Sequence, residues 1–120
     1  MFAYKLFGSG LGSQTTACFT DVAAGLTATG TIQSDAYAMT AAINEFTTVA
    51  AGTGARLSSL AVAGDSQTVY NGGANALKVY PDSGVRINGI PTNIGILVAT
   101  NTTCEFVRVS ATRWIGKLSA

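Results

Sequence analysis

The second half of the chain alternates between short strand-like runs and turn-forming residues. Gly, Asn, Asp and Pro interrupt runs of β-branched and aromatic side chains about every 8–12 residues, a spacing typical of all-β domains. Asn-Gly favours hairpin turns because both residues accept positive φ, and Pro-Asp-Ser-Gly favours a type I turn. We therefore expect strands over residues 55–60, 67–70, 76–80, 85–87, 94–99, 104–109 and 112–118.

Residues 34–46 fit two structures. Their Ala-rich composition, with Ser34 or Asp35 as an N-cap, favours a helix. The alternation at Tyr37 and Met39 favours strands instead. We favour strands, because the sequence that follows is strand-like.

Glycine and serine dominate residues 8–13, where the lack of side chains that pack predicts a flexible arm. We expect this arm to join a short strand at residues 2–7 to the body of the protein. Its Gly-rich spacing lacks the Lys-Ser/Thr of a phosphate-binding loop. The prediction is a single β-sandwich, jelly-roll-like domain at residues 34–120, preceded by a strand and glycine-rich arm at residues 1–33.

Alternation along the strands separates the core from the surface. It predicts that Val69, Leu77 and Val79 point inward. Trp114, the only tryptophan, is expected to fill the core, with its indole N–H bonded to a backbone carbonyl. These side chains define the predicted interior of the domain.

The run at residues 104–109 has two distinct faces. Val107 and Val109 share one of them, while Phe106 and Arg108 share the other. Aromatic and arginine side chains are enriched in interface cores. We therefore expect a subunit contact at Phe106 and Arg108.

Few charges cover this chain of 120 residues. Charged residues make up 11% of it and apolar residues 48%, against about 25% charged in an average soluble domain. The formal net charge is +1, too small to attract nucleic acid. A polar but uncharged surface suits a chain that packs against copies of itself or another protein. No apolar run reaches the length of a signal peptide's core or of a membrane span.

The residue inventory argues against catalysis. The chain has no histidine, so Cys18 and Cys104 have no evident activating base and no metal-ligand spacing. We expect no catalytic residues, no metal and no cofactor. Buried thiols are favoured over a disulfide between the two cysteines. A small hydrolase stays open as an alternative only if two of the six carboxylates lie about 5–10 Å apart in a cleft.

Residues 64–89 read Gly-Asp-Ser-Gln-Thr-Val-Tyr-Asn-Gly-Gly-Ala-Asn-Ala-Leu-Lys-Val-Tyr-Pro-Asp-Ser-Gly-Val-Arg-Ile-Asn-Gly. This stretch resembles small β domains of tailed-bacteriophage virion proteins. The resemblance extends over about residues 30–118, with an Ala/Thr-rich strand and a tryptophan near the end.

The resemblance implies a capsid decoration, or cement, protein. Such a protein is usually a homotrimer that binds the major capsid protein on the outside of the phage head and stabilises the contacts between capsid subunits. It would be assembled in the host cytoplasm and carried on the virion surface, with no nucleic acid and no membrane as a direct partner. The candidate interface consists of Phe2, Tyr4, Phe7, Leu11, Tyr70, Tyr80, Phe106 and Arg108.

The same resemblance leaves a second function open. A tail-fibre, spike or baseplate domain would bind a receptor or carbohydrate through exposed tyrosines with Asn and Asp. The candidates for that role are Tyr70, Tyr80, Asn71, Asn75 and Asp82.

Overall fold

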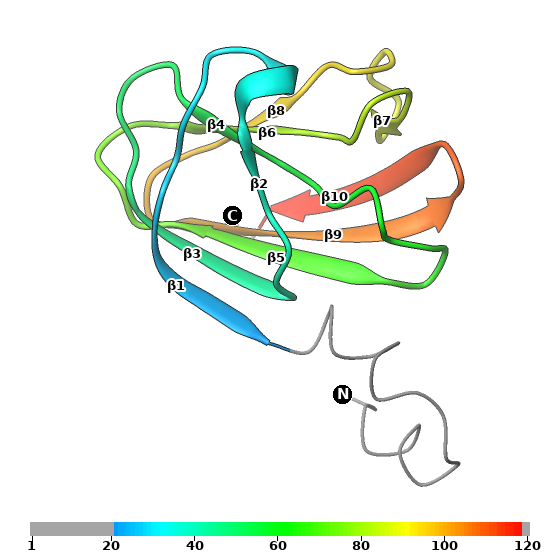
Figure 1. Cartoon of the computed structure of the whole chain (residues 1–120), viewed down its shortest axis with the longest axis horizontal. Helices are drawn as coiled ribbons and strands as arrows, with labels where there is room; N and C mark the ends of the chain where they lie inside the picture. The colour runs from blue at the N-terminus through cyan, green and yellow to red at the C-terminus, as the bar shows by residue number, and fades with distance from the viewer. Residues whose placement is uncertain (1–20, 119–120) are drawn as a thin grey trace, which may run out of the picture.

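The computed structural model of the chain describes residues 21–118, which form two β-sheets in two layers (Figure 1). The six-stranded sheet has the order β1 (Val22–Thr27), β3 (Ile43–Thr48), β5 (Ser66–Asn71), β9 (Thr102–Ser110), β10 (Arg113–Leu118) and β7 (Arg86–Ile87). The four-stranded sheet has the order β2 (Tyr37–Ala38), β4 (Gly54–Arg56), β6 (Leu77–Tyr80) and β8 (Ile96–Val98). A short 3₁₀ helix, η1 (Gln33–Asp35), precedes β2.

The chain changes sheet at every strand from β1 to β6. As a result β1, β3 and β5 run parallel in one sheet, and β2, β4 and β6 run parallel in the other, as in the coils of a β-solenoid. The parallel winding ends after β6. In one sheet β8 pairs antiparallel with β6, and in the other β9 pairs antiparallel with β5 and forms a hairpin with β10.

The all-β prediction is confirmed, whereas the strand pairing differs from the expected jelly-roll-like arrangement. A jelly roll is built from antiparallel strands. Here five strand pairs are parallel and three are antiparallel within residues 21–118. The connections explain the difference: Asn71-Gly72, which favours a hairpin, instead carries the chain from one sheet to the other.

Asn71 holds this crossing in place from inside the fold. Its buried amide nitrogen donates to the carbonyls of Asn75 and Val98, both at 2.8 Å, and its amide oxygen accepts from the backbone N–H of Gly73 at 2.9 Å. Gly73 has no room for a side chain, since a Cβ there would lie 2.6 Å from the side chain of Val49. The crossing is therefore fixed by a satisfied amide and a close packing contact.

The hydrophobic core lies between the two sheets and confirms the predicted inward positions. Val69, Leu77, Val79 and Trp114 are all fully buried. The core cluster is completed by Ala28, Met39, Phe46, Val49, Ala55, Leu57, Ala61, Val85, Ile87, Val98, Cys104 and Phe106. Within residues 21–118, no helix is long and apolar enough to cross a bilayer.

The N-terminal third follows the prediction in part. Strands form within residues 34–46 as favoured, although η1 occupies the start of that segment. The boundary expected at residue 34 does not coincide with a structural one, because β1 already pairs with β3 in the six-stranded sheet. The strand at residues 2–7 and the arm at residues 8–13 lie outside the described residues.

Candidate protein-binding surfaces

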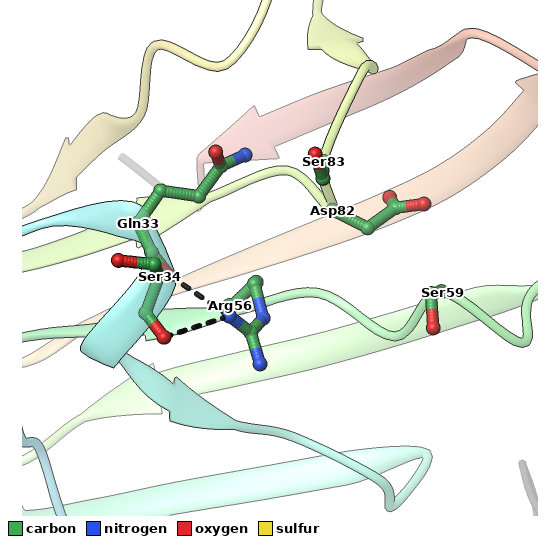
Figure 2. Close-up of a pocket in the computed structure, with 6 residues that line it drawn as sticks. All are labelled: Gln33, Ser34, Arg56, Ser59, Asp82 and Ser83. Carbon is green, nitrogen blue, oxygen red and sulfur yellow. Dashed lines mark hydrogen bonds between the residues drawn. The ribbon is translucent and has the colours of Figure 1, made fainter.

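A pocket of about 250 Å³ opens beside η1, β4 and the turn that follows β6 (Figure 2). Its lining consists of Gln33, Ser34, Arg56, Ser59, Asp82 and Ser83. No aromatic or aliphatic side chain belongs to this set. The lining therefore brings hydrogen-bonding groups and charge to the pocket.

Arg56, the last residue of β4, is half-buried in the pocket wall. Its Nη1 donates to the backbone carbonyls of Gln33 and Ser34, at 3.0 and 3.3 Å. The side-chain amide of Gln33 in turn donates to the carbonyl of Pro81 at 2.8 Å and to Oδ1 of Asn93 at 3.1 Å. These contacts fix η1 against the neighbouring turn and hold the guanidinium at the pocket.

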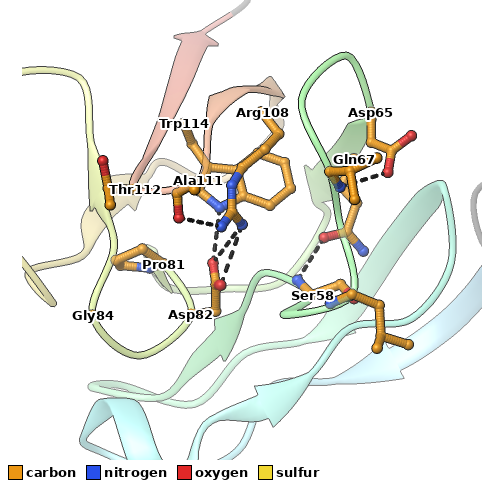
Figure 3. Close-up of polar contacts among 12 residues, drawn as sticks. Ser58, Asp65, Gln67, Pro81, Asp82, Gly84, Arg108, Ala111, Thr112 and Trp114 are labelled. Atoms are coloured by element: carbon orange, nitrogen blue, oxygen red, sulfur yellow. Dashed lines mark hydrogen bonds and ion pairs between the residues drawn. The ribbon is translucent and has the colours of Figure 1, made fainter.

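Asp82 belongs both to the pocket and to a buried polar cluster behind it (Figure 3). Its Oδ1 accepts from the indole N–H of Trp114 at 2.9 Å and from Nη1 of Arg108 at 3.1 Å. Its Oδ2 also accepts from Nη1 of Arg108, at 3.2 Å. The indole therefore bonds to a carboxylate, and the expected backbone-carbonyl partner of Trp114 is wrong.

The rest of the Arg108 guanidinium is bonded to backbone carbonyls of the turn between β9 and β10. Nε donates to the carbonyl of Ser110 at 2.7 Å, and Nη2 donates to that of Ala111 at 2.8 Å. The guanidinium also lies over the ring of Trp114, 5.3 Å from its centroid. Each nitrogen of this buried cation has an acceptor, which is the condition for keeping a charge inside a protein.

Of the four expected interface residues that lie within residues 21–118, three are inside the domain. Alternation correctly paired Phe106 with Arg108, but this pair faces the core: Phe106 is fully buried and Arg108 is 6% exposed. Tyr80 is also buried and donates its hydroxyl to the carbonyl of Thr31 at 3.1 Å. Tyr70 is half-exposed on the outer side of β5, with its hydroxyl 3.4 Å from Oδ1 of Asn101. Phe2, Tyr4, Phe7 and Leu11 lie outside the described residues.

The residues considered for carbohydrate binding are not gathered on one exposed surface. Asn71, Tyr80 and Asp82 are buried and bonded within the domain. Asn75 is exposed, but its amide donates to the carbonyl of Val49 at 2.9 Å. Tyr70 is the one residue of this set with an accessible aromatic ring, because Tyr80 is buried. These residues therefore do not form a stacking platform of several aromatic side chains.

The face of the six-stranded sheet that points away from the core carries several exposed aliphatic side chains. Val22 on β1 lies opposite Ile43, which lies opposite Thr68 on β5. On the same face, further along the sheet, Val107 on β9 lies opposite Ile115 on β10. Val22, Ile43 and Ile115 are exposed, and Thr68 and Val107 are half-buried. We call these five residues the outer face.

Two charges on that side of the sheet lie opposite each other, whereas Glu45, two residues from Ile43 on β3, lies opposite Tyr70. Glu105 on β9 lies opposite Lys117 on β10, and both are exposed. Cross-strand neighbours of opposite sign reduce each other's field. The outer face therefore presents aliphatic groups beside one opposed pair of charges and the carboxylate of Glu45.

The titratable residues give little sign of reactive chemistry. Burial raises the pKa of the Cys104 thiol to about 11, so it stays protonated at neutral pH. Among residues 21–118, no group of three or more His, Cys, Asp or Glu side chains could hold a metal ion. Cys104 is a buried free thiol, and Cys18 lies outside the described residues.

In comparisons with known proteins, the chain matched no protein-family model, no curated protein and no solved structure.

Proposed function

We propose that this protein decorates the head of a tailed bacteriophage and binds the major capsid protein through its outer face. The observation that carries the proposal is that the aliphatic side chains of Val22, Ile43 and Ile115 are exposed on one face of the six-stranded sheet. Large aliphatic side chains gathered on one exposed face of a sheet are a mark of a protein contact. The resemblance of residues 64–89 to phage virion domains supplies the biological setting.

The size of the outer face limits the strength of a single contact. Strands lie about 4.8 Å apart and rise about 3.3 Å per residue, so five strands of six residues cover roughly 500 Å². A stable protein interface buries about 800 Å² on each partner. One outer face is therefore too small for tight binding alone. A homotrimer that engages several capsid subunits would gain the missing affinity through avidity.

The alternative proposal is a tail domain that binds a receptor carbohydrate. Protein sites for sugars combine hydrogen-bonding groups with exposed rings, and the pocket supplies only the first of these. We therefore favour the capsid contact.

Sedimentation with purified, expanded heads that lack decoration protein tests the proposal. The wild-type chain should co-sediment with the heads and raise their melting temperature. The double variant Ile43→Lys/Ile115→Lys should bind at least about 10-fold more weakly, because two charges would be buried without partners. Leu97→Lys, which adds one charge at an exposed position of β8 in the other sheet, is the control and should bind normally.

Two results would count against this function. The first is a wild-type protein that fails to co-sediment with the heads. The second is a double variant that binds as well as Leu97→Lys while remaining folded by circular dichroism.

A further inference from the structure

Arg56 has no acidic partner among the side chains of this protein. All six Asp and Glu residues lie within residues 21–118, and the ion pair found among them joins Arg108 to Asp82. Arg56 instead uses Nη1 for two backbone carbonyls. Nε and Nη2 have no acceptor among residues 21–118, and Figure 2 shows the guanidinium at the pocket with its bonds made at one nitrogen.

These two nitrogens form one edge of the guanidinium. A carboxylate binds arginine best when its two oxygens accept parallel hydrogen bonds from such an edge. The carbonyls of Gln33 and Ser34 fix the orientation of Arg56 in advance, so a ligand would not have to order the side chain.

The rest of the pocket suits an anion. Asp82 contributes a negative charge to the lining, but Arg108 and Trp114 already engage its oxygens. Arg56, Asp82 and Arg108 together leave one positive charge. The hydroxyls of Ser59 and Ser83 make no hydrogen bond to other residues of the described range and can donate to a ligand.

The volume of the pocket and the residues around it favour a protein side chain as the ligand. The cavity of about 250 Å³ is smaller than the roughly 300–1,000 Å³ of pockets for whole cofactors or drug-sized molecules. Ile32 and Leu60 are the chain neighbours of the lining residues Gln33 and Ser59. Their aliphatic side chains are 58% and 68% exposed. Arginine is one of the residue types that carry most of the binding energy in protein interfaces.

We propose that this pocket binds an Asp or Glu side chain of a partner protein, flanked in the partner by aliphatic residues. The side-chain carboxylate pairs with Nε and Nη2 of Arg56, and the flanking residues pack on Ile32 and Leu60. The site rests on Arg56 and its neighbours alone, so it is independent of the capsid contact at the outer face.

Nuclear magnetic resonance on the ¹⁵N-labelled wild-type chain tests this site directly. The probes are the capped peptide acetyl-Leu-Glu-Leu-amide, its Gln counterpart, sodium acetate and inorganic phosphate. We expect the Glu peptide to shift the Arg56 Nε–H signal and the backbone amides of Ser59 and Ser83 in a saturable way. The Gln peptide should bind at least about 10-fold more weakly because it lacks the charge, and acetate should bind more weakly because it lacks the aliphatic groups.

Variants separate Arg56 from general electrostatic attraction. Arg56→Gln should abolish the shifts at Ser59 and Ser83, and Arg56→Lys should retain a weaker response. Lys117→Gln, which removes one positive charge on β10, should respond as the wild type does.

Three outcomes would overturn the proposal. Equal responses to the Glu and Gln peptides would exclude recognition of the carboxylate. Tighter binding of phosphate than of the Glu peptide would assign the pocket to a different anion. Shifts confined to residues outside the pocket would place the peptide elsewhere.

Discussion

Arg108 and Arg56 are the same residue type in two contrasting settings. Arg108 is buried, pairs with Asp82, and has an acceptor for each of its guanidinium nitrogens. Arg56 is half-buried beside a pocket and uses one nitrogen. A charge deep in a protein must be compensated within the fold, whereas a charge at a pocket can be compensated by water and then by a ligand. The contrast separates a cation that holds the structure together from one that is available for binding.

The largest expected effect comes from removing the counterion of Arg108. Asp82→Asn keeps the shape of the side chain and an acceptor for Trp114 but leaves the buried guanidinium without a negative partner. We expect the free energy of unfolding to fall by about 3–5 kcal/mol, as measured by urea titration. Asp21→Asn, a matched change at an exposed carboxylate, should stay within about 0.5 kcal/mol of the wild type.

A double variant sharpens this result. Asp82→Asn combined with Arg108→Met removes both charges, so no uncompensated ion remains buried. We expect it to be more stable than Asp82→Asn alone. If the double variant were the less stable of the two, the cost would come from lost packing rather than from an unpaired charge.

A smaller effect is expected at Cys104, which faces the core from β9 as Arg108 does but has no compensating charge. Because its pKa is raised to about 11 from 9.0, the thiol is protonated in the folded protein at pH values where the unfolded chain ionises it. This contribution to stability is present below pH 9 and is lost as the pH rises toward 11.

The loss should be on the order of 1 kcal/mol by pH 10. Urea titrations between pH 8 and about 10.5 measure it, with Cys104→Ala as the control in which this part of the pH dependence disappears. A slope that is identical in the two proteins would show that Cys104 does not ionise differently on unfolding.

The smallest effect on stability is expected for Arg56→Gln. The substitution removes two hydrogen bonds to backbone carbonyls of Gln33 and Ser34, but water can reach these carbonyls near the pocket. We expect a loss of less than about 1 kcal/mol in the same urea titration. A cost equal to that of Asp82→Asn would make Arg56 a structural residue and remove the contrast between the two arginines.

Local patterns in the sequence account for the strands and for the residues that face the core. Alternation correctly placed Val69, Leu77 and Val79 inward, because side chains on a strand point to opposite faces in turn. The winding of the chain was not predictable in this way. Asn71-Gly72 has the composition of a hairpin turn, but in the fold it leads into the other sheet and is held there by buried bonds from Asn71 to Asn75 and Val98.

The polar positions were harder to predict than the apolar ones. An arginine on a strand is usually exposed, and the pattern did not reveal that Arg108 meets Asp82, 26 residues away, inside the domain. The sequence did not indicate the position of Arg56 at a pocket either, since its carbonyl partners lie 22 and 23 residues earlier in the chain. Pairings over such distances depend on the winding and become visible only in the folded structure.

The switch between sheets at each strand from β1 to β6 makes the two layers dependent on each other during folding. Neither layer can be completed from one continuous stretch of sequence, because successive strands contribute to opposite layers. Pairing distant segments costs loop-closure entropy before the core is buried, which slows folding. A fragment ending anywhere before β5 would lack strands from both layers at once. Unfolding of this domain should therefore be a single cooperative event rather than the loss of one layer followed by the other.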